Sequence, residues 1–169
     1  MRISNIITEV ATGFLGYREI GQNEGFEHPV FQKMLYERGW RSGMAWCAVF
    51  AELVYYTVYK DRRKELDRLF NVSAVQTWHN FVKGGWTVSG VPVRGALAVW
   101  QLHREGVKDW RGHIAIVESF EKDMITTIDG NSNQSGGRQG IEVARITRVL
   151  NFQEDNGLRL LGFIIPKEI

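Results

Sequence analysis

The only cysteine of the chain, Cys47, lies in the segment GMAWCAVF (43–50), where a long apolar helix is predicted to begin. In the first turn of a helix the backbone N–H groups lack intrahelical partners and the helix dipole is positive, and both features stabilise a thiolate. Reactive cysteines of low pKa occupy such positions. Free cysteines are also among the most buried residue types, so a packed structural thiol is the competing interpretation.

His113 is the candidate base for this cysteine. It begins the strand-like segment HIAIVE directly after Gly112, and a glycine there leaves room for another side chain beside the imidazole. A histidine within reach of a thiol can act as its general base, although a histidine at a strand end can also be a simple surface residue. Three other histidines are weaker candidates, being predicted at a helix start, on a helix and in a polar turn: His28, His79 and His103.

A polar acceptor is predicted beside His113 on the next strand. The segment 112–130 should form a hairpin, and opposed residues of an antiparallel pair share a face. A turn centred on position 121 places Asp129 opposite His113, and a turn centred on position 122 places Asn131 there. Either side chain can accept an imidazole N–H and so fix the tautomer. We favour Asp129, although the run D-G-N is also an ordinary turn signal.

The elements around these residues indicate an α+β fold in one domain, 1–169. A helical half, about 1–85, precedes a sheet half, about 93–166, and this order predicts helices packed on an antiparallel sheet of about five strands. Apolar spacing and capping residues predict helices over 3–14, 28–40, 45–60 and 73–85. Short segments rich in Val, Ile and Thr predict strands over 93–102, 112–120, 124–130, 140–149 and 158–166.

Composition excludes several classes of function. The net charge is +2, and the densest basic run, residues 60–68, is interleaved with acids, so no nucleic-acid-binding stripe is predicted. No apolar run is long enough for a membrane span, and no secretory signal is evident. One cysteine and four scattered histidines give no metal-ligand spacing. Neither a metal nor another cofactor is therefore expected.

The ordered set W-C-A-x-F, G-H-I-A-I-V and I-D-G-N resembles the CHAP amidases (cysteine- and histidine-dependent amidohydrolases/peptidases), within the papain-like, NlpC-related group. The resemblance extends over about 19–166 and is best to single-domain phage and bacterial members. It implies Cys47 as nucleophile, His113 as base, and Asp129 with Asn131 as orienting groups. Asp129 stands where the family usually has Glu, which shortens the side chain by one methylene.

The resemblance further implies hydrolysis of an amide bond in peptidoglycan, as in endolysins and other antibacterial wall-degrading enzymes. The bond would lie in the stem peptide, in the cross-bridge, or between muramic acid and L-alanine. Trp46, next to the nucleophile, is the expected substrate-binding residue, and the backbone N–H of Cys47 is the expected oxyanion donor. Weaker candidates for the rim of the cleft are Asn23, Glu24 and Gln134.

Two other functions are alternatives, and the same residues would serve the first of them equally. One is a papain-like cysteine hydrolase that acts as a toxin or effector on an amide outside the wall, with an immunity protein as partner if it is secreted. The other is a non-enzymatic wall-binding module, which would be expected to lose the cysteine or the histidine. We expect a monomer that is synthesised in the cytoplasm without a signal peptide. It would act on the cell wall or in the periplasm after phage-dependent or secretion-system-dependent delivery.

Overall fold

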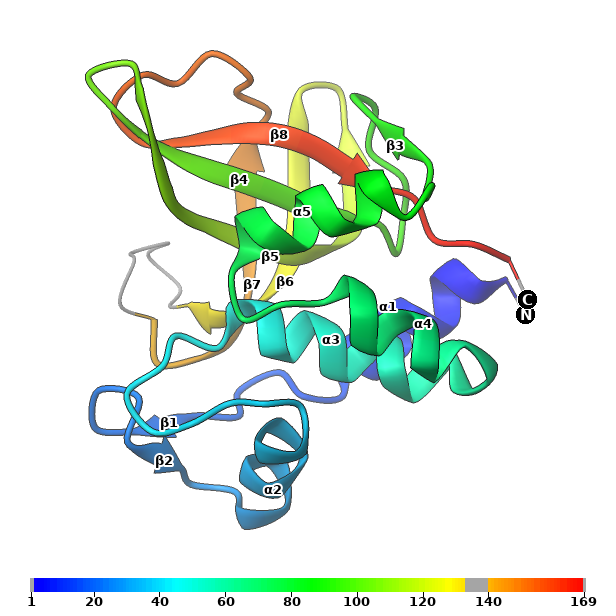
Figure 1. Cartoon of the computed structure of the whole chain (residues 1–169), viewed down its shortest axis with the longest axis vertical. Coiled ribbons are helices and arrows are strands. Elements are labelled where there is room, and N and C mark those ends of the chain that lie inside the picture. The colour runs from blue at the N-terminus through cyan, green and yellow to red at the C-terminus, as the bar shows by residue number, and fades with distance from the viewer. Residues whose placement is uncertain (1, 133–139, 169) are drawn as a thin grey trace.

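A computed structural model describes residues 2–132 and 140–168 of the chain (Figure 1). The fold is α+β, as the sequence predicts. The helices of the described residues are α1 (Ile3–Thr12), α2 (Pro29–Glu37), α3 (Cys47–Val58), the 3₁₀ turn η1 (Lys60–Arg62), α4 (Arg63–Leu69) and α5 (Ala74–Lys83). The strands are β1 (Glu19–Ile20), β2 (Gly25–Phe26), β3 (Val88–Ser89), β4 (Leu97–Arg104), β5 (Val107–Glu121), β6 (Met124–Ser132), β7 (Glu142–Val149) and β8 (Leu158–Ile164).

The main sheet is antiparallel with the strand order β3-β8-β4-β5-β6-β7, and β1 pairs with β2 in a separate two-stranded sheet. Helix α3 contacts β5 and β6, and α1 and α5 also contact β5 (Figure 1). One face of the sheet packs on α3 through residues such as Val99, Ile114 and Ile128. The other face carries a second apolar cluster that includes Trp100, Ala115 and Phe163. The site described below is formed by strand residues and by Cys47 at the start of α3.

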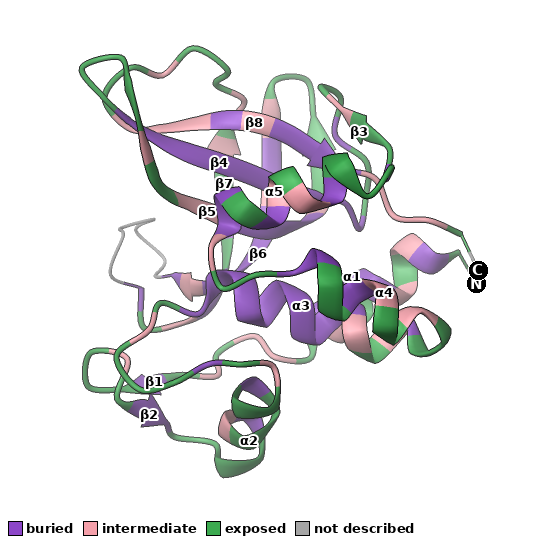
Figure 2. Ribbon diagram, viewed as in Figure 1, coloured by how far each residue is buried: buried purple, intermediate pink, exposed green. Residues whose placement is uncertain are grey.

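Helix α3 is buried because its sequence, CAVFAELVYYTV, is apolar around most of its circumference. All nine residues from Cys47 to Tyr55 are buried (Figure 2). The helix begins after Trp46, whose side chain makes no capping hydrogen bond. The N–H groups of the first turn are therefore left for partners other than a capping side chain.

The sheet differs from the sequence expectation in its number of strands and in the length of its central hairpin. It has six strands where about five are expected, because the short β3 pairs with β8. Strands β4 and β5 also form one continuous hairpin through Glu105 and Gly106, which take φ angles of 50° and 76°. The charged segment between 103 and 111 shows no apolar alternation, so the sequence signal for these strand ends is missing. Within the described residues we find no helix of the length and apolarity needed to cross a membrane.

Candidate active site

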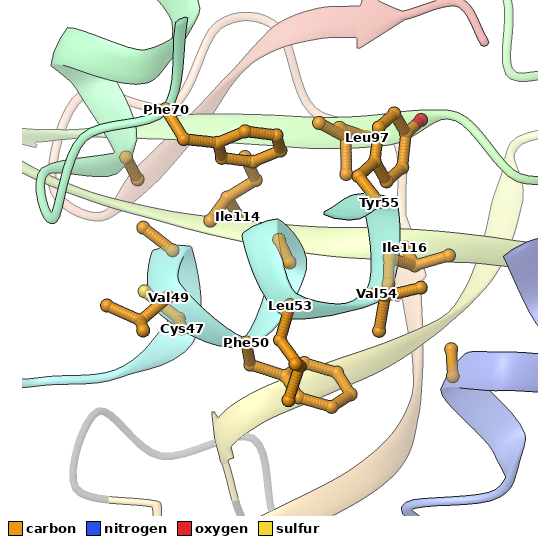
Figure 3. Close-up of a cluster of buried hydrophobic side chains, with 14 of the residues drawn as sticks. Cys47, Val49, Phe50, Leu53, Val54, Tyr55, Phe70, Leu97, Ile114 and Ile116 are labelled. Carbon is orange, nitrogen blue, oxygen red and sulfur yellow. The ribbon is translucent and has the colours of Figure 1, made fainter. Parts of the chain in front are cut away.

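Cys47 is the first residue of α3, and its side chain is almost fully enclosed, with 7% of the residue exposed. Figure 3 shows it in the first turn of the helix, beneath the strand that carries Ile114. Burial by itself raises the pKa of the thiol, but a hydrogen bond with His113, the positive charge of that imidazole, and the backbone N–H groups of Ile114 and Ala48 lower it by more. The net effect is a pKa below the ordinary value for cysteine, which favours the nucleophilic thiolate.

His113 joins the cysteine to a carboxylate. Its Nε2 lies 2.6 Å from Oδ2 of Asp129, so Nδ1 is the ring nitrogen that remains for the thiol of Cys47. Burial lowers the pKa of the imidazole, but the hydrogen bonds and charges of Asp129 and Cys47 raise it to about 9. The structure therefore brings Cys47, His113 and Asp129 into one hydrogen-bonded chain. In this chain the histidine can take the thiol proton and the aspartate can stabilise the imidazolium.

Asp129 reaches His113 from a diagonal position in the sheet. Strands β5 and β6 pair Ile116 with Ile128, a register that would place Asn131 opposite His113 if it continued. The pairing ends at that point, and the carboxylate of Asp129 spans the gap to the imidazole. The register of Ile116 and Ile128 is that of a turn centred on position 122, one of the two alternatives that the sequence leaves open. A register shift between 117 and 119 moves the turn itself to 122–123.

Asn131 stands apart from this chain. It takes a φ angle of 53° and is half-buried, and the pairing of β6 with β7 is irregular between Asp129 and Ser132. A left-handed residue leaves the regular alternation of a strand, so Asn131 does not follow Asp129 onto the face predicted for both. Among the described residues, the hydrogen-bond partners of His113 are Asp129 and Cys47.

Two glycines allow these elements to approach one another. A Cβ atom on Gly130 would lie 2.6 Å from the Cβ of Phe50, so this glycine lets β6 pack closely against α3. A Cβ on Gly112 would collide with the backbone carbonyl of Trp100 on the neighbouring strand and with Val75 of α5. The glycine before the histidine is therefore needed for strand and helix packing, in addition to any room it leaves beside the imidazole.

Arg148 and Thr127 belong to the site and were missed in the sequence. Arg148 Nη2 donates to Asp129 Oδ2 at 2.6 Å, and its Nη1 donates to Thr127 Oγ1 at 2.7 Å. Thr127 Oγ1 in turn donates to Asp129 Oδ1 at 2.5 Å. Alternation could have placed Thr127 with Asp129, two residues later on the same strand. No comparable signal marks Arg148, because its contact runs between strands at a register that the sequence does not reveal.

Trp46, the expected substrate-binding residue, lies in the core. Its exposure is 0%, its ring packs edge-on against Phe26 and Phe50, and its indole N–H donates to Oε2 of Glu19 at 2.7 Å. A side chain enclosed in this way has no face for a ligand, so its position corrects the expectation that it lines the cleft. Apolar residues before a helix often fix how the chain enters it, and Trp46 fits that structural role.

The structure describes two of the three residues expected at the rim of the cleft. Asn23 and Glu24 lie in the turn between β1 and β2, close to the loop before α3, since Asn23 O accepts a hydrogen bond from the backbone N–H of Gly43. Gln134 lies outside the described residues. Within the described ranges no group of three or more His, Cys, Asp or Glu side chains is arranged to hold a metal ion.

Replacing Trp46 by phenylalanine should destabilise the fold. The change keeps an aromatic ring but removes the indole N–H and leaves the carboxylate of Glu19, a residue only 9% exposed, with one donor fewer. We expect a loss of about 1–3 kcal/mol in the free energy of unfolding, measured by urea denaturation. Trp110→Phe is the matched control: Trp110 is 74% exposed, so its variant should stay within about 0.5 kcal/mol. Equal stability of the two variants would contradict a structural role for Trp46.

A family model described as "CHAP domain" matches residues 39–131, more than half of the chain. Among solved structures the chain is similar to "The crystal structure of Ly7917", with 16% identity and a TM-score of 0.42, over 96% of this chain and 62% of that one. The chain thus spans less than two thirds of the length of that protein. No curated relative matches the chain significantly. The segment matched by the family model contains Cys47, His113 and Asp129.

Proposed function

Since the chain belongs to the CHAP family of peptidoglycan amidases and peptidases, we propose that it hydrolyses an amide bond of peptidoglycan, with Cys47 as nucleophile, His113 as base and Asp129 as orienting residue. The bond is one in the stem peptide or cross-bridge, or the one between muramic acid and L-alanine. The observation that carries this proposal is the hydrogen-bonded chain from the helix-start thiol through the imidazole to a buried carboxylate.

Each step of the reaction uses a contact described above. The thiolate of Cys47 attacks the amide carbonyl carbon, and the imidazolium of His113 gives its Nδ1 proton to the leaving amine. This step breaks the C–N bond and leaves a thioester on Cys47. His113 then takes a proton from water and the hydroxide attacks the thioester. The C–S bond breaks, the carboxylic acid product leaves and loses its proton to solvent, and the thiolate–imidazolium pair is restored. The backbone N–H of Cys47, in the first turn of α3, is our candidate donor to the oxyanion.

Mass spectrometry of purified muropeptides after digestion tests this proposal directly. We expect products whose masses increase by one water at an amide bond, with unchanged glycan linkages. The position of the new carboxyl and amino groups identifies which of the three bonds is cut. Hydrolysis of soluble peptide amides without any cleavage of muropeptides would instead favour a papain-like hydrolase that acts on an amide outside the wall.

The pH dependence of turnover should have its alkaline limb near pH 9. Activity requires a deprotonated Cys47 together with a protonated His113, and the pKa of Cys47 is lowered while the pKa of His113 is raised to about 9. Activity therefore rises as the thiol loses its proton and falls as the imidazole loses its own at about pH 9. The profile of kcat/KM on a soluble muropeptide measures both limbs. A decline already centred near 6.5, the ordinary pKa of histidine, would contradict the ion pair.

The thermal stability of the fold should also depend on the protonation of His113. His113 has a higher pKa in the folded chain than its ordinary value of 6.5, so its stabilising contribution is complete below pH 6.5 and is lost as pH rises through about 9. Thermal unfolding at pH values between these limits should therefore reveal a decrease in Tm that is absent in the His113→Gln variant.

A further inference from the structure

Both carboxylate oxygens of Asp129 accept hydrogen bonds, and Arg148 contributes to this network through two of its nitrogens. Oδ2 accepts from Nε2 of His113 and from Nη2 of Arg148, each at 2.6 Å. Oδ1 accepts from the hydroxyl of Thr127, which itself accepts from Nη1 of Arg148. The carboxylate side chain is 0% exposed. One guanidinium thus bridges the aspartate and the threonine that holds its second oxygen.

Arg148 is itself held in place by an aromatic ring. Its guanidinium carbon lies 5.0 Å from the centroid of the Trp100 ring, within the range of a cation–π contact. The same ring lies 5.7 Å from the imidazole of His113. Only 20% of the Arg148 side chain is exposed. A guanidinium stacked on a ring and bonded at two nitrogens has little freedom, so it can fix the carboxylate that fixes the imidazole.

The charges of this site balance only if Arg148 is counted. Four ionisable groups meet here, one each from α3, β5, β6 and β7: Cys47, His113, Asp129 and Arg148. In the reactive state the thiolate and carboxylate carry two negative charges, and the imidazolium and guanidinium carry two positive charges. The carboxylate of Glu19 bonds to the indole N–H of Trp46, the residue before Cys47, and is not one of the four groups of this cluster. Without Arg148 the enclosed cluster would be net negative, a state that low polarity penalises.

We propose that Arg148 is a positioning residue that clamps Asp129 and supplies the second positive charge needed for Cys47 and His113 to exist as a thiolate–imidazolium pair. Its described hydrogen bonds are to Asp129 and Thr127, so it acts on Cys47 and His113 through the carboxylate that it holds and through its charge. The inference rests on the proposed function only in taking Cys47 as the nucleophile. The state of the thiol can be measured without any substrate, so the two proposals can fail separately.

Alkylation of Cys47 by iodoacetamide as a function of pH is the test, and the lone cysteine makes the signal specific. Arg148→Gln removes the charge while keeping a hydrogen-bond donor, and it should raise the midpoint of the alkylation profile by about one pH unit. At a pH below the midpoint this corresponds to about tenfold slower labelling. Arg148→Lys keeps the charge but lacks the planar fork that bonds Asp129 and Thr127 together, so its midpoint should stay near that of the wild type while turnover on muropeptides falls.

Arg145→Gln is the matched control. Arg145 lies on the same strand and also makes a two-nitrogen contact with a carboxylate, that of Glu118, at 2.5 and 2.7 Å. That pair lies outside the chain formed by Cys47, His113 and Asp129, and 48% of the Arg145 side chain is exposed. Its alkylation profile should match that of the wild type. A difference as large as that of Arg148→Gln would overturn the proposal, because any loss of positive charge on this strand would then be sufficient.

Each possible result of these measurements either supports or overturns the proposal. A raised midpoint in Arg148→Gln alone, with thermal melting that shows a folded protein, supports the proposal. An unchanged midpoint in a folded Arg148→Gln variant overturns it, as does a midpoint in Arg148→Lys that shifts as far as in the glutamine variant. Should Arg148→Gln fail to fold, the lysine variant decides: a retained midpoint with reduced turnover supports the clamp, and wild-type turnover overturns it.

Discussion

Replacing Cys47 by serine is expected to reduce hydrolysis of peptidoglycan by about 10⁵-fold or more, to the background rate, because removing a nucleophile eliminates the covalent route. The hydroxyl of serine has a far higher pKa than a thiol, so the imidazole of His113 cannot hold it as an alkoxide. The substitution exchanges a single atom at a site with 7% exposure, so the surrounding packing has little reason to change. Release of muropeptides from purified walls provides the measurement.

Two controls test whether this loss of activity comes from the missing thiol and not from unfolding. Circular dichroism and the melting temperature should match the wild type, which excludes unfolding as the cause. Wild-type Cys47 should react with iodoacetamide faster than a model thiol at neutral pH, since its pKa is lowered by His113 and by backbone N–H groups, which together outweigh burial. A Cys47→Ser variant that retains wild-type turnover would exclude the cysteine mechanism, and an inert thiol would restore the interpretation as a structural cysteine.

Replacing Asp129 by alanine is expected to lower turnover by about 10³–10⁴-fold, whereas Asn131→Ala should keep most of the activity. Asp129 is the residue that accepts from Nε2 of His113, and loss of that acceptor leaves the imidazole tautomer unfixed. Asn131 takes a left-handed conformation beyond the regular pairing of the strand, away from this contact. Turnover of both variants on the same muropeptide, measured side by side, makes the comparison.

The aspartate variant also needs a stability control, because it leaves His113 and Arg148 without their shared acceptor. Breaking a buried ion pair from one side costs about 3–5 kcal/mol, so a clear drop in Tm is expected for Asp129→Ala. Asp129→Asn keeps the shape and one oxygen, and should remain better folded while staying impaired in turnover. If the Asn131 variant is the inactive one and the Asp129 variants remain active, the orienting residue is Asn131 and our assignment is wrong.

The sequence by itself predicted the order of the main elements and which of them carry the candidate site residues. The apolar run 45–60 indicates a buried helix with Cys47 near its start, and HIAIVE and MITTID indicate neighbouring strands; the structure has α3, β5 and β6 at these places. These predictions depend on periodicity and helix-start chemistry, which are local properties of the chain. The family match over 39–131 likewise follows from motifs that are contiguous in sequence.

Only the tertiary structure decided which side chains meet. Alternation assigned Asp129 and Asn131 to one face, but a register shift in β5, the end of the pairing and the left-handed Asn131 leave Asp129 diagonally within reach of His113. The burial of Trp46 depends on aromatic rings contributed from Phe26 and Phe31, which are 20 and 15 residues away in sequence.

Arg148 gives the clearest case of a residue that only the fold could assign. Its strand was predicted, but its guanidinium reaches along the sheet to Thr127 and Asp129 instead of the directly opposed residue, which is Ile125. A long side chain can extend past its own position in a sheet, and its direction is set by what surrounds it, here the ring of Trp100 on a third strand. Sequence periodicity specifies the face on which a residue lies, whereas contacts between strands depend on register, twist and side-chain reach, and these are fixed only when the whole sheet is assembled.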